Sequence, residues 1–156
     1  MDYRKEYEKW LASPALSEDE RAELKALEGN DKEIKARFYG PLEFGTAGLR
    51  GTMYTGLHNM NRHVIRWATQ GFANVIRAEG TEAMQKGVAV CMDCRNHSAE
   101  FARETACVMA ANGIHVRLFE SLRPTPELSF AVREYGCQAG VNVTASHNPK
   151  EYNGYE

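Results

Sequence analysis

The sequence predicts an α/β domain built around parallel strands, and three short apolar runs carry that prediction. The runs cover residues 87–92, 113–119 and 139–144, and a helical segment separates each run from the next. This alternation is typical of parallel βαβ units with right-handed crossovers. Ligands of such sheets bind at the loops that leave the carboxyl ends of the strands. The loops DCRNHS, ESLRPTP and TASHNP are therefore candidates for a binding edge.

The two helices between these runs have recognisable ends. The first is predicted over about 98–111 and stops before Gly113, a residue suited to a helix C-terminus. The second is predicted over about 125–136, with Pro126 at the first helical position and Gly136 at its end. Both helices are long enough to connect parallel strands.

A long amphipathic helix is predicted before the first strand, opened by Asn61 and closed by Gly80. Its apolar residues recur at helical spacing and should share one face. That face consists of Val64, Ile65, Ala68, Phe72, Val75 and Ile76.

The first forty residues are charged and helical in character. Ser17 and Glu20 have the spacing of a capping box, and a helix over about 18–28 should follow. Leu24 and Leu27 would face a core. We interpret this part as a helical N-terminal extension and not as a separate domain.

Composition excludes several classes of protein. A hydrophobic content of 43% over 156 residues is sufficient for one core. The 19 basic and 21 acidic residues give neither a nucleic-acid binder's charge nor a polybasic membrane signal. The N-terminus, MDYRKEYEKW, lacks the apolar core of a signal peptide, and no apolar run is long enough for a membrane span. We therefore expect a cytoplasmic protein that binds neither nucleic acid nor membrane.

Two of the four cysteines, Cys91 and Cys94, have a C-x-x-C spacing that is found in redox and zinc sites. Cys91 lies inside the apolar run GVAVCM, and there is no second C-x-x-C. A thiol in that setting behaves as a small hydrophobic group, so the structural interpretation is favoured.

A glycine-rich segment, LEFGTAGLRGTM, precedes the long helix. Gly45, Gly48 and Gly51 are too closely spaced for a helix interior, so the segment is predicted to be a loop whose amides approach a ligand. Arg50 in this loop has a planar fork suited to phosphate. An arginine on a solvated loop is an equally good interpretation of Arg50 alone.

The densest group of reactive residues is TASHNPKEYNGYE, residues 144–156. Ser146 follows a predicted buried strand, and Asn148-Pro149 prevents immediate entry into a helix, so its hydroxyl should sit on a rigid turn. Such a serine can carry a group covalently, and His147 can exchange a proton. A turn-forming serine is the alternative. A serine hydrolase is disfavoured, because no G-x-S-x-G elbow and no oriented acid are visible.

Asp93 and Arg95 follow the first predicted strand. Their opposite charges could pair and hold neighbouring loops together. We expect a structural role for them.

Taken in order, four motifs resemble the α-D-phosphohexomutase family, which contains phosphoglucomutases and phosphomannomutases. The motifs are FGTAGLRG (44–51), MDCRNHS (92–98), PTPELSFAVREYG (124–136) and VTASHNPKEYNGY (143–155). The helical extension is most similar to the longer chains of this family, a subgroup that also contains phosphopentomutases. The resemblance implies a three-layer α/β/α domain with a mainly parallel mixed sheet over residues 41–156, the first of about four domains, preceded by the helical extension at 1–40.

The resemblance also implies roles for individual residues. Ser146 would carry the phosphoryl group, His147 would assist proton transfer, and Arg50 would contact phosphate, while Asn148 and Lys150 would shape the loop and bind substrate phosphate. The family interconverts hexose 1-phosphates and 6-phosphates through a bisphosphate intermediate, with glucose 1,6-bisphosphate as activator. It uses Mg²⁺, held by the phosphoserine and by three aspartates of a second domain.

The chain departs from the family at Glu156, where a lysine usually serves as general acid or base. A carboxylate there repels an anionic substrate, although it is able to accept a hydroxyl proton. The long extension favours phosphoglucomutase over phosphomannomutase or phosphopentomutase. The rival from another class is a sugar-phosphate-binding module without catalysis. The remaining domains of the same polypeptide are expected partners, and the 156-residue chain alone should turn over little or no hexose phosphate.

Overall fold

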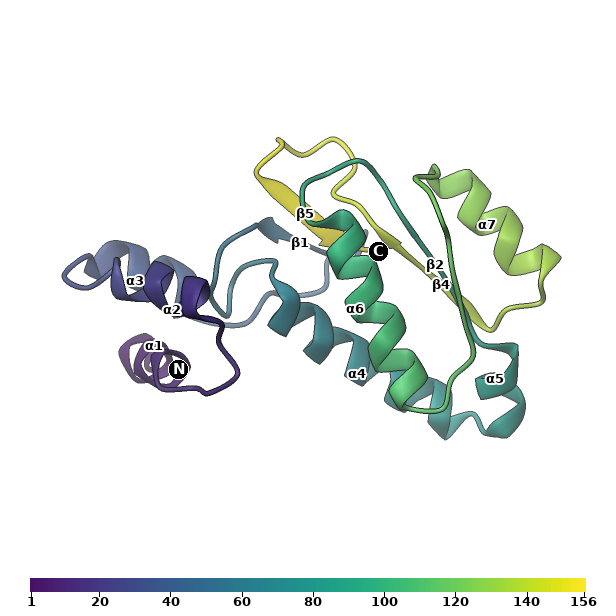
Figure 1. Ribbon diagram of the computed structural model, residues 1–156, viewed down its shortest axis with the longest axis horizontal. Helices are drawn as coiled ribbons and strands as arrows, with labels where there is room; N and C mark the ends of the chain where they lie inside the picture. Colours follow the sequence, from purple (N-terminus) through teal and green to yellow (C-terminus); the bar gives the residue numbers. More distant parts are fainter.

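The computed structural model describes all 156 residues, and its ribbon is shown in Figure 1. Seven helices and five strands follow one another along the chain. In order they are α1 (Tyr3–Leu11), α2 (Glu18–Lys25), α3 (Asp31–Phe38), β1 (Leu49–Thr52), α4 (Arg62–Ala78), α5 (Thr81–Lys86), β2 (Val88–Met92), α6 (Ser98–Ala111), β3 (Val116–Leu118), α7 (Thr125–Glu134), β4 (Ala139–Val143) and β5 (Tyr152–Tyr155).

The central sheet has three parallel strands in the order β3-β2-β4. The predicted runs at 87–92, 113–119 and 139–144 supply these strands, and the parallel arrangement is confirmed. The chain passes from β2 to β3 through α6, and then crosses back beyond β2 to β4 through α7. Because of this reversal, the switch point of the strand order lies between β2 and β4. Ligands of open α/β sheets bind outside the carboxyl ends of the strands at such a point.

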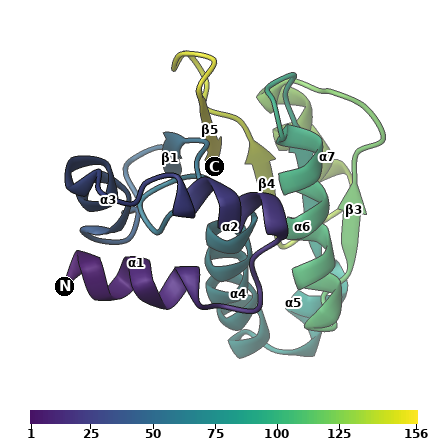
Figure 2. The ribbon, with the colours of Figure 1, turned by 60° about the vertical axis from the view of Figure 1, so that its left-hand side comes forward.

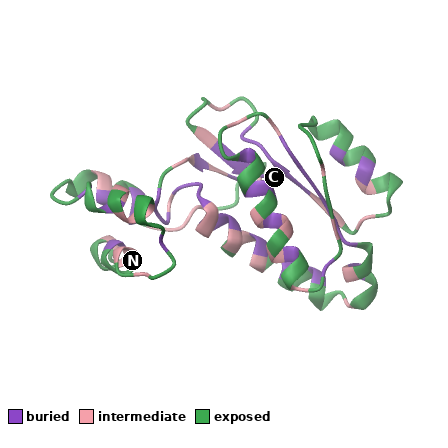
Figure 3. Ribbon diagram, in the orientation of Figure 1, coloured by how far each residue is buried: buried purple, intermediate pink, exposed green.

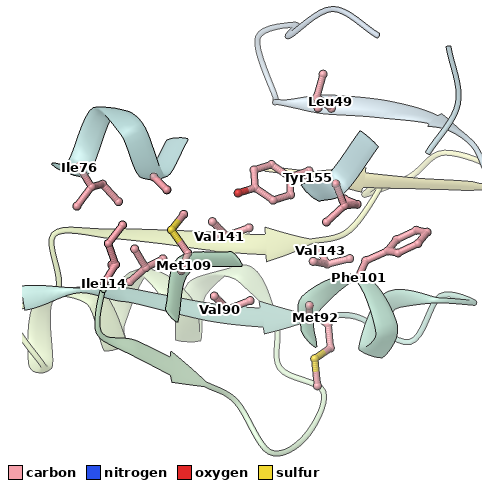
Figure 4. Packing of buried hydrophobic residues seen from close by; sticks show 14 of the residues in the cluster. Leu49, Ile76, Val90, Met92, Phe101, Met109, Ile114, Val141, Val143 and Tyr155 are labelled. Carbon is pink, nitrogen blue, oxygen red and sulfur yellow. The ribbon is translucent and has the colours of Figure 1, made fainter. Parts of the chain in front are cut away.

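Side chains alternate across β2 and divide the core into two faces. Val88, Val90 and Met92 belong to a cluster of 16 buried residues that also includes residues of α4 and α6. Figure 4 shows part of this cluster, with Val90 and Met92 near Phe101 and Met109 of α6. Ala89 and Cys91, in contrast, pack with Leu128 of α7.

Helices therefore cover both faces of the sheet, with α4 and α6 on one side and α7 on the other (Figure 1). The expected α/β/α layering is confirmed.

A second, two-stranded sheet pairs β1 with β5 in antiparallel fashion, with Leu49 opposite Tyr155 and Arg50 opposite Gly154. It joins the parallel sheet through Glu156. The amide of Asn142 in β4 donates to the carbonyl of Glu156 over 2.9 Å, and the amide of Glu156 donates back over 3.0 Å. This reciprocal pair is an antiparallel link on the side of β4 away from β2, and it gives the combined sheet the mixed character that we expected.

The N-terminal helices α1, α2 and α3 lie to one side of the sheet (Figures 1 and 2). They have a core of their own, formed by Tyr7, Leu16, Leu24, Leu27, Ile34, Phe38 and Leu57. The Ser17–Glu20 capping box is present at the start of α2. Arg62 at the start of α4 reaches back to Glu20 with two hydrogen bonds of 2.9 Å. The extension is thus fixed to the rest of the chain by both packing and charge.

Some expectations about individual elements were wrong. The stretch predicted as a loop, residues 42–53, contains the whole of β1, so Arg50 and Gly51 lie on a strand. The backbone hydrogen bonds of this strand come from its pairing with β5, which the glycine-rich sequence alone does not indicate.

The predicted face of α4 is correct except at Val75, which is 57% exposed. Thr69 and Ala73 are buried on that helix instead. The most buried residues of α4 therefore form a stripe along positions 65, 69, 73 and 76. Figure 3 shows burial concentrated on the strands and on the inner sides of the helices.

No helix is long and apolar enough to cross a bilayer.

Candidate active site

Ser146 lies on an exposed turn just beyond the end of β4, at the strand switch point. Its backbone is in the left-handed region, with φ of 52°. A non-glycine residue adopts this region only when its surroundings hold it there. Here the amide of Ser146 donates to Thr144 Oγ1 over 3.0 Å, and the amide of Asn148 closes the turn by donating to the Ala145 carbonyl over 2.9 Å. The predicted rigid turn is therefore present.

His147 lies beside the serine hydroxyl. Its Nδ1 atom is 3.4 Å from Ser146 Oγ, at the long end of hydrogen-bond range. Both side chains are exposed, and no acid contacts the imidazole. A hydrolytic triad needs a histidine that a third group orients, so this geometry offers a proton acceptor but not a triad.

Arg50 faces the same loop from β1. Its Nε and Nη2 atoms donate to Glu156 Oε1 over 2.9 and 2.6 Å, and its Nη1 atom donates to Asn148 Oδ1 over 3.2 Å. The side chain is 23% exposed. The structure thus brings Arg50, Asn148 and Glu156 together, with the guanidinium at the edge of the Ser146 loop.

Lys150 belongs to the same loop but lies at its exposed tip, and its ammonium group makes no ion pair. The long lysine stem leaves this charge mobile and solvated. Of the five predicted site residues, Lys150 is the one that the structure does not tie to the others.

The glycine segment contributes shape more than amide donors. The amide of Gly45 donates to the Gly48 carbonyl over 2.9 Å, and the amide of Gly48 donates back over 3.3 Å. These two amides are used within the loop and are not free to bind a ligand. Gly48 has φ of 84°, and a Cβ there would collide with the Tyr155 carbonyl, so the loop can pack on β5 only with glycine at this position.

The expected Asp93–Arg95 pair is present, with 3.3 Å between Arg95 Nε and Asp93 Oδ2. Asp93 also accepts from the Ser98 hydroxyl over 2.9 Å and from the Thr144 hydroxyl over 2.6 Å. The carboxylate therefore joins the end of β2, the start of α6 and the end of β4. Sequence reasoning missed Thr144 and Ser98. The signal for Thr144 was a hydroxyl residue at the end of a buried strand, two positions before the candidate nucleophile.

Asn153 is a further residue that the sequence did not single out. Its side chain is fully buried and donates to the Asn96 carbonyl over 2.9 Å and to the Ser98 hydroxyl over 3.0 Å. These hydrogen bonds fix β5 against the loop that follows β2, and they help to hold the strand that follows the Ser146 loop in place.

Cys91 is fully buried, and Cys94 is exposed. Burial, together with the nearby Asp93 charge, raises the pKa of the Cys91 thiol to about 11. A thiol with such a pKa is protonated and unreactive at neutral pH. Cys91 acts as a core residue, as its apolar surroundings in the sequence indicated.

No three His, Cys, Asp or Glu side chains of this chain lie together in a way that could hold a metal ion. The site can offer Mg²⁺ the oxygen of a modified Ser146, which is a hard ligand of the kind that this ion prefers. Any further ligands of the Mg²⁺ ion would have to come from residues outside the site described above.

Comparison with known proteins identifies the family. Residues 41–156 match the model of "Phosphoglucomutase/phosphomannomutase, alpha/beta/alpha domain I". The chain belongs to the α-D-phosphohexomutase family, and residues 41–156 are its α/β/α domain I.

Relatives with three different names are similar to this chain. A phosphopentomutase of Homo sapiens is 41% identical over 135 residues, which cover 83% of this chain and 22% of that protein. A phosphoglucomutase of Staphylococcus aureus (strain USA300) is 40% identical over 125 residues, covering 80% and 22%. A phosphomannomutase of Mycoplasma pneumoniae is 34% identical over 153 residues, covering 97% and 27%.

A solved structure also matches. The crystal structure of a putative phosphomannomutase from Thermus thermophilus aligns with a TM-score of 0.66 at 32% identity, covering 75% of this chain and 25% of that chain. This chain thus spans about a quarter of the length of the proteins it resembles.

Proposed function

We propose that this chain is the phosphoserine-carrying part of a phosphosugar mutase, with Ser146 as the residue that carries the phosphoryl group. The observation that supports this most directly is the exposed Ser146 hydroxyl on a constrained turn, with Arg50 joined to the same loop through Asn148. Phosphoryl transfer requires positioning and neutralisation of charge more than covalent chemistry from the protein. The turn supplies the first of these, and the guanidinium supplies the second.

The proposed reaction consists of two phosphoryl transfers. In the first, the bond between Ser146 Oγ and phosphorus breaks as a hydroxyl oxygen of the sugar monophosphate bonds to phosphorus. The sugar hydroxyl proton passes to a base, and the released Ser146 oxygen takes up a proton. The resulting sugar bisphosphate turns around. In the second transfer, its other phosphoryl group bonds to Ser146 Oγ, and the sugar oxygen that is released regains a proton. His147, 3.4 Å from Ser146 Oγ, is placed to give a proton to the serine oxygen released in the first transfer and to take it back when that oxygen bonds to phosphorus in the second.

Arg50 binds the phosphate of the substrate in this scheme. Its two donors to Glu156 have the side-by-side arrangement with which a guanidinium also binds phosphate oxygens. A substrate phosphate would replace the Glu156 carboxylate at this fork. Asn148 would stay in place and orient the guanidinium, while Lys150 would add positive charge at the rim of the loop.

Mg²⁺ would be held by a phosphoryl oxygen on Ser146 and by aspartates outside this chain, as the family resemblance implies. When bound, it would neutralise charge on the phosphoryl group being transferred.

The substrate class follows from what the relatives share. Their names refer to a pentose, to glucose and to mannose, and each of the three is named a phosphosugar mutase. We retain glucose 1-phosphate as the proposed substrate, with glucose 1,6-bisphosphate as activator. Mannose 1-phosphate and ribose 1-phosphate are the alternatives to be tested beside it.

The test uses a chimera in which this chain replaces the matching segment of the Staphylococcus aureus phosphoglucomutase. We expect mutase activity with Mg²⁺ and a trace of glucose 1,6-bisphosphate, phosphate on Ser146 by mass spectrometry, and loss of both in Ser146→Ala. Ser129→Ala, on the exposed side of α7, is the matched control. The 156-residue chain alone should turn over little or no substrate.

Two results would contradict the proposal. Activity that is unchanged by Ser146→Ala would remove the serine from the reaction. Reversible binding of sugar phosphate, with Ser146 never phosphorylated in the chimera, would favour the sugar-phosphate-binding module without catalysis.

A further inference from the structure

Arg95 makes an unusual set of contacts with the Ser146 loop. Its Nη2 atom donates to the carbonyls of Ser146 and Asn148 over 2.8 and 2.7 Å. Its Nη1 atom donates to the carbonyls of Pro149 and Tyr152 over 2.8 and 3.0 Å. One guanidinium thus gathers four backbone carbonyls from a segment of seven residues, 146–152.

The fifth donor of Arg95, Nε, lies 3.3 Å from Asp93 Oδ2. A guanidinium has five N–H groups. In Arg95 four of them donate to the carbonyls, and the fifth, on Nε, lies beside the Asp93 carboxylate in an ion pair. The side chain is only 12% exposed. Arg95 therefore has no donor left for a phosphate, and its charge acts on the main chain of the loop.

Asp93 and Arg95 together fix the backbone of Ser146, one at its amide and the other at its carbonyl. Asp93 accepts from the Thr144 hydroxyl over 2.6 Å, and that hydroxyl accepts from the Ser146 amide over 3.0 Å. Arg95 holds the Ser146 carbonyl. The left-handed φ of 52° at Ser146 is thus fixed at its amide and at its carbonyl by one ion pair.

We propose that Arg95 is a positioning residue for phosphoryl transfer, which holds the Ser146 hydroxyl in its reactive orientation through the loop's carbonyls and does not touch the phosphate. This inference rests on the proposed function. Its chemical basis is that transfer is sensitive to small misplacement of the reacting oxygen, whereas binding of the sugar phosphate depends on Arg50 and its neighbours.

Arg95→Lys is the informative substitution because it keeps the positive charge. A lysine ammonium has three donors on one atom and cannot span four carbonyls as a planar fork does. The loop should then sample other conformations, although its net charge is unchanged. Arg66→Lys is the matched control, since Arg66 pairs only with the side chain of Glu104, away from the site.

The first readout is amide hydrogen exchange in the 156-residue chain. We expect Arg95→Lys to speed exchange of the Ser146 amide about tenfold or more while α4 and α6 keep their protection, which would show local loosening. The second readout is steady-state kinetics in the chimera. We expect kcat to fall about 10²-fold and KM to change less than about threefold, because chemistry and not binding is affected.

Thr144→Val is a second variant for the case in which Arg95→Lys does not fold. It removes the hydroxyl between Asp93 and the Ser146 amide with almost no change in side-chain shape. The expected pattern is the same, with a smaller loss of kcat.

The outcomes separate the two proposals. A wild-type chimera without mutase activity overturns the proposed function, and the positioning role with it. An active wild type together with unchanged kcat in both Arg95→Lys and Thr144→Val overturns the positioning role alone. A rise in KM at constant kcat also overturns it, since that result would place Arg95 in substrate binding.

Discussion

Two arginines beside the same loop are held in opposite ways. Arg95 donates to four backbone carbonyls and forms an ion pair with Asp93, whereas Arg50 donates to two side chains, Glu156 and Asn148. Backbone carbonyls that belong to a folded loop cannot leave their donor without the loop opening. Side-chain oxygens can rotate away and allow a ligand to take their place. This difference fits the proposed roles, in which Arg95 maintains the shape of the loop and Arg50 binds a ligand.

The substitution Gly154→Ala tests whether the backbone segments beside the two arginines are packed rigidly against one another. A Cβ at this position would collide with the Thr144 carbonyl, and it would lie 2.7 Å from the Leu49 carbonyl and 3.2 Å from Cγ of Arg50. We expect Gly154→Ala to lower the free energy of unfolding by about 3 kcal/mol, since neither backbone can move freely. Urea denaturation of the 156-residue chain measures this. Gly71→Ala, in α4 with open space around it, should instead gain about 0.5–1 kcal/mol.

If Gly154→Ala proves as mild as Gly71→Ala, then β5 is not pressed between these carbonyls, and the two arginines do not share a rigid frame.

Arg50 should show the kinetic effects opposite to those of Arg95. We expect Arg50→Ala in the chimera to lower kcat/KM about 10²-fold, with a marked rise in KM, because a phosphate contact made in the ground state is lost. Arg103→Ala, on the exposed side of α6, controls for the change in net charge. A fall in kcat at constant KM would erase the contrast between the two arginines.

Glu156 should compete with phosphate for Arg50. Since its carboxylate accepts two hydrogen bonds from that guanidinium, we expect Glu156→Ala to tighten binding of inorganic phosphate to the 156-residue chain about tenfold. Isothermal titration measures the dissociation constants. Glu151→Ala removes an exposed carboxylate from the same loop and serves as the control. Equal effects of the two variants would attribute the gain to net charge alone.

A third arginine, Arg62, binds Glu20 of the N-terminal extension and should affect stability only. Burial by itself would raise the pKa of its partner Glu20, but hydrogen bonds from Arg62, the Ser17 amide and His63 outweigh it and lower that pKa from 4.5 to about 2. A lowered carboxyl pKa gives stability that is complete above about pH 4.5 and is lost as pH falls toward 2.

Glu20→Gln should therefore cost about 1 kcal/mol at pH 7, and the difference from wild type should vanish near pH 2. Thermal melts across this range measure it. Glu18→Gln, exposed in the same helical turn, should show no such dependence. A cost that persists at pH 2 would mean that the packing of the side chain, and not its charge, matters.

The sequence predicted the parallel strands and their crossover helices well, because apolar runs and helix caps are local signals. The helix over Ser98–Ala111 has the bounds that its ends indicated. The strands β1 and β5 were missed, since their glycines and polar residues favour loops, and only their pairing makes them strands.

The site was predicted in part. The spacing indicated Ser146 as the residue on a turn, and the opposite charges of Asp93 and Arg95 indicated their pairing. The four carbonyls that Arg95 gathers could not be foreseen, because the direction of a carbonyl depends on backbone angles that no pattern of side chains encodes. The Arg50–Glu156 pair was likewise hidden by a separation of 106 residues.

That separation has a consequence for synthesis of the protein. The chain emerges from the ribosome from its N-terminus, and β1 has no partner strand until β5 has been made. Arg50 is therefore translated long before the surface that orients it exists, and closing so long a loop is a slow step. Until β5 has been made, the glycine-rich segment has an unpaired strand edge.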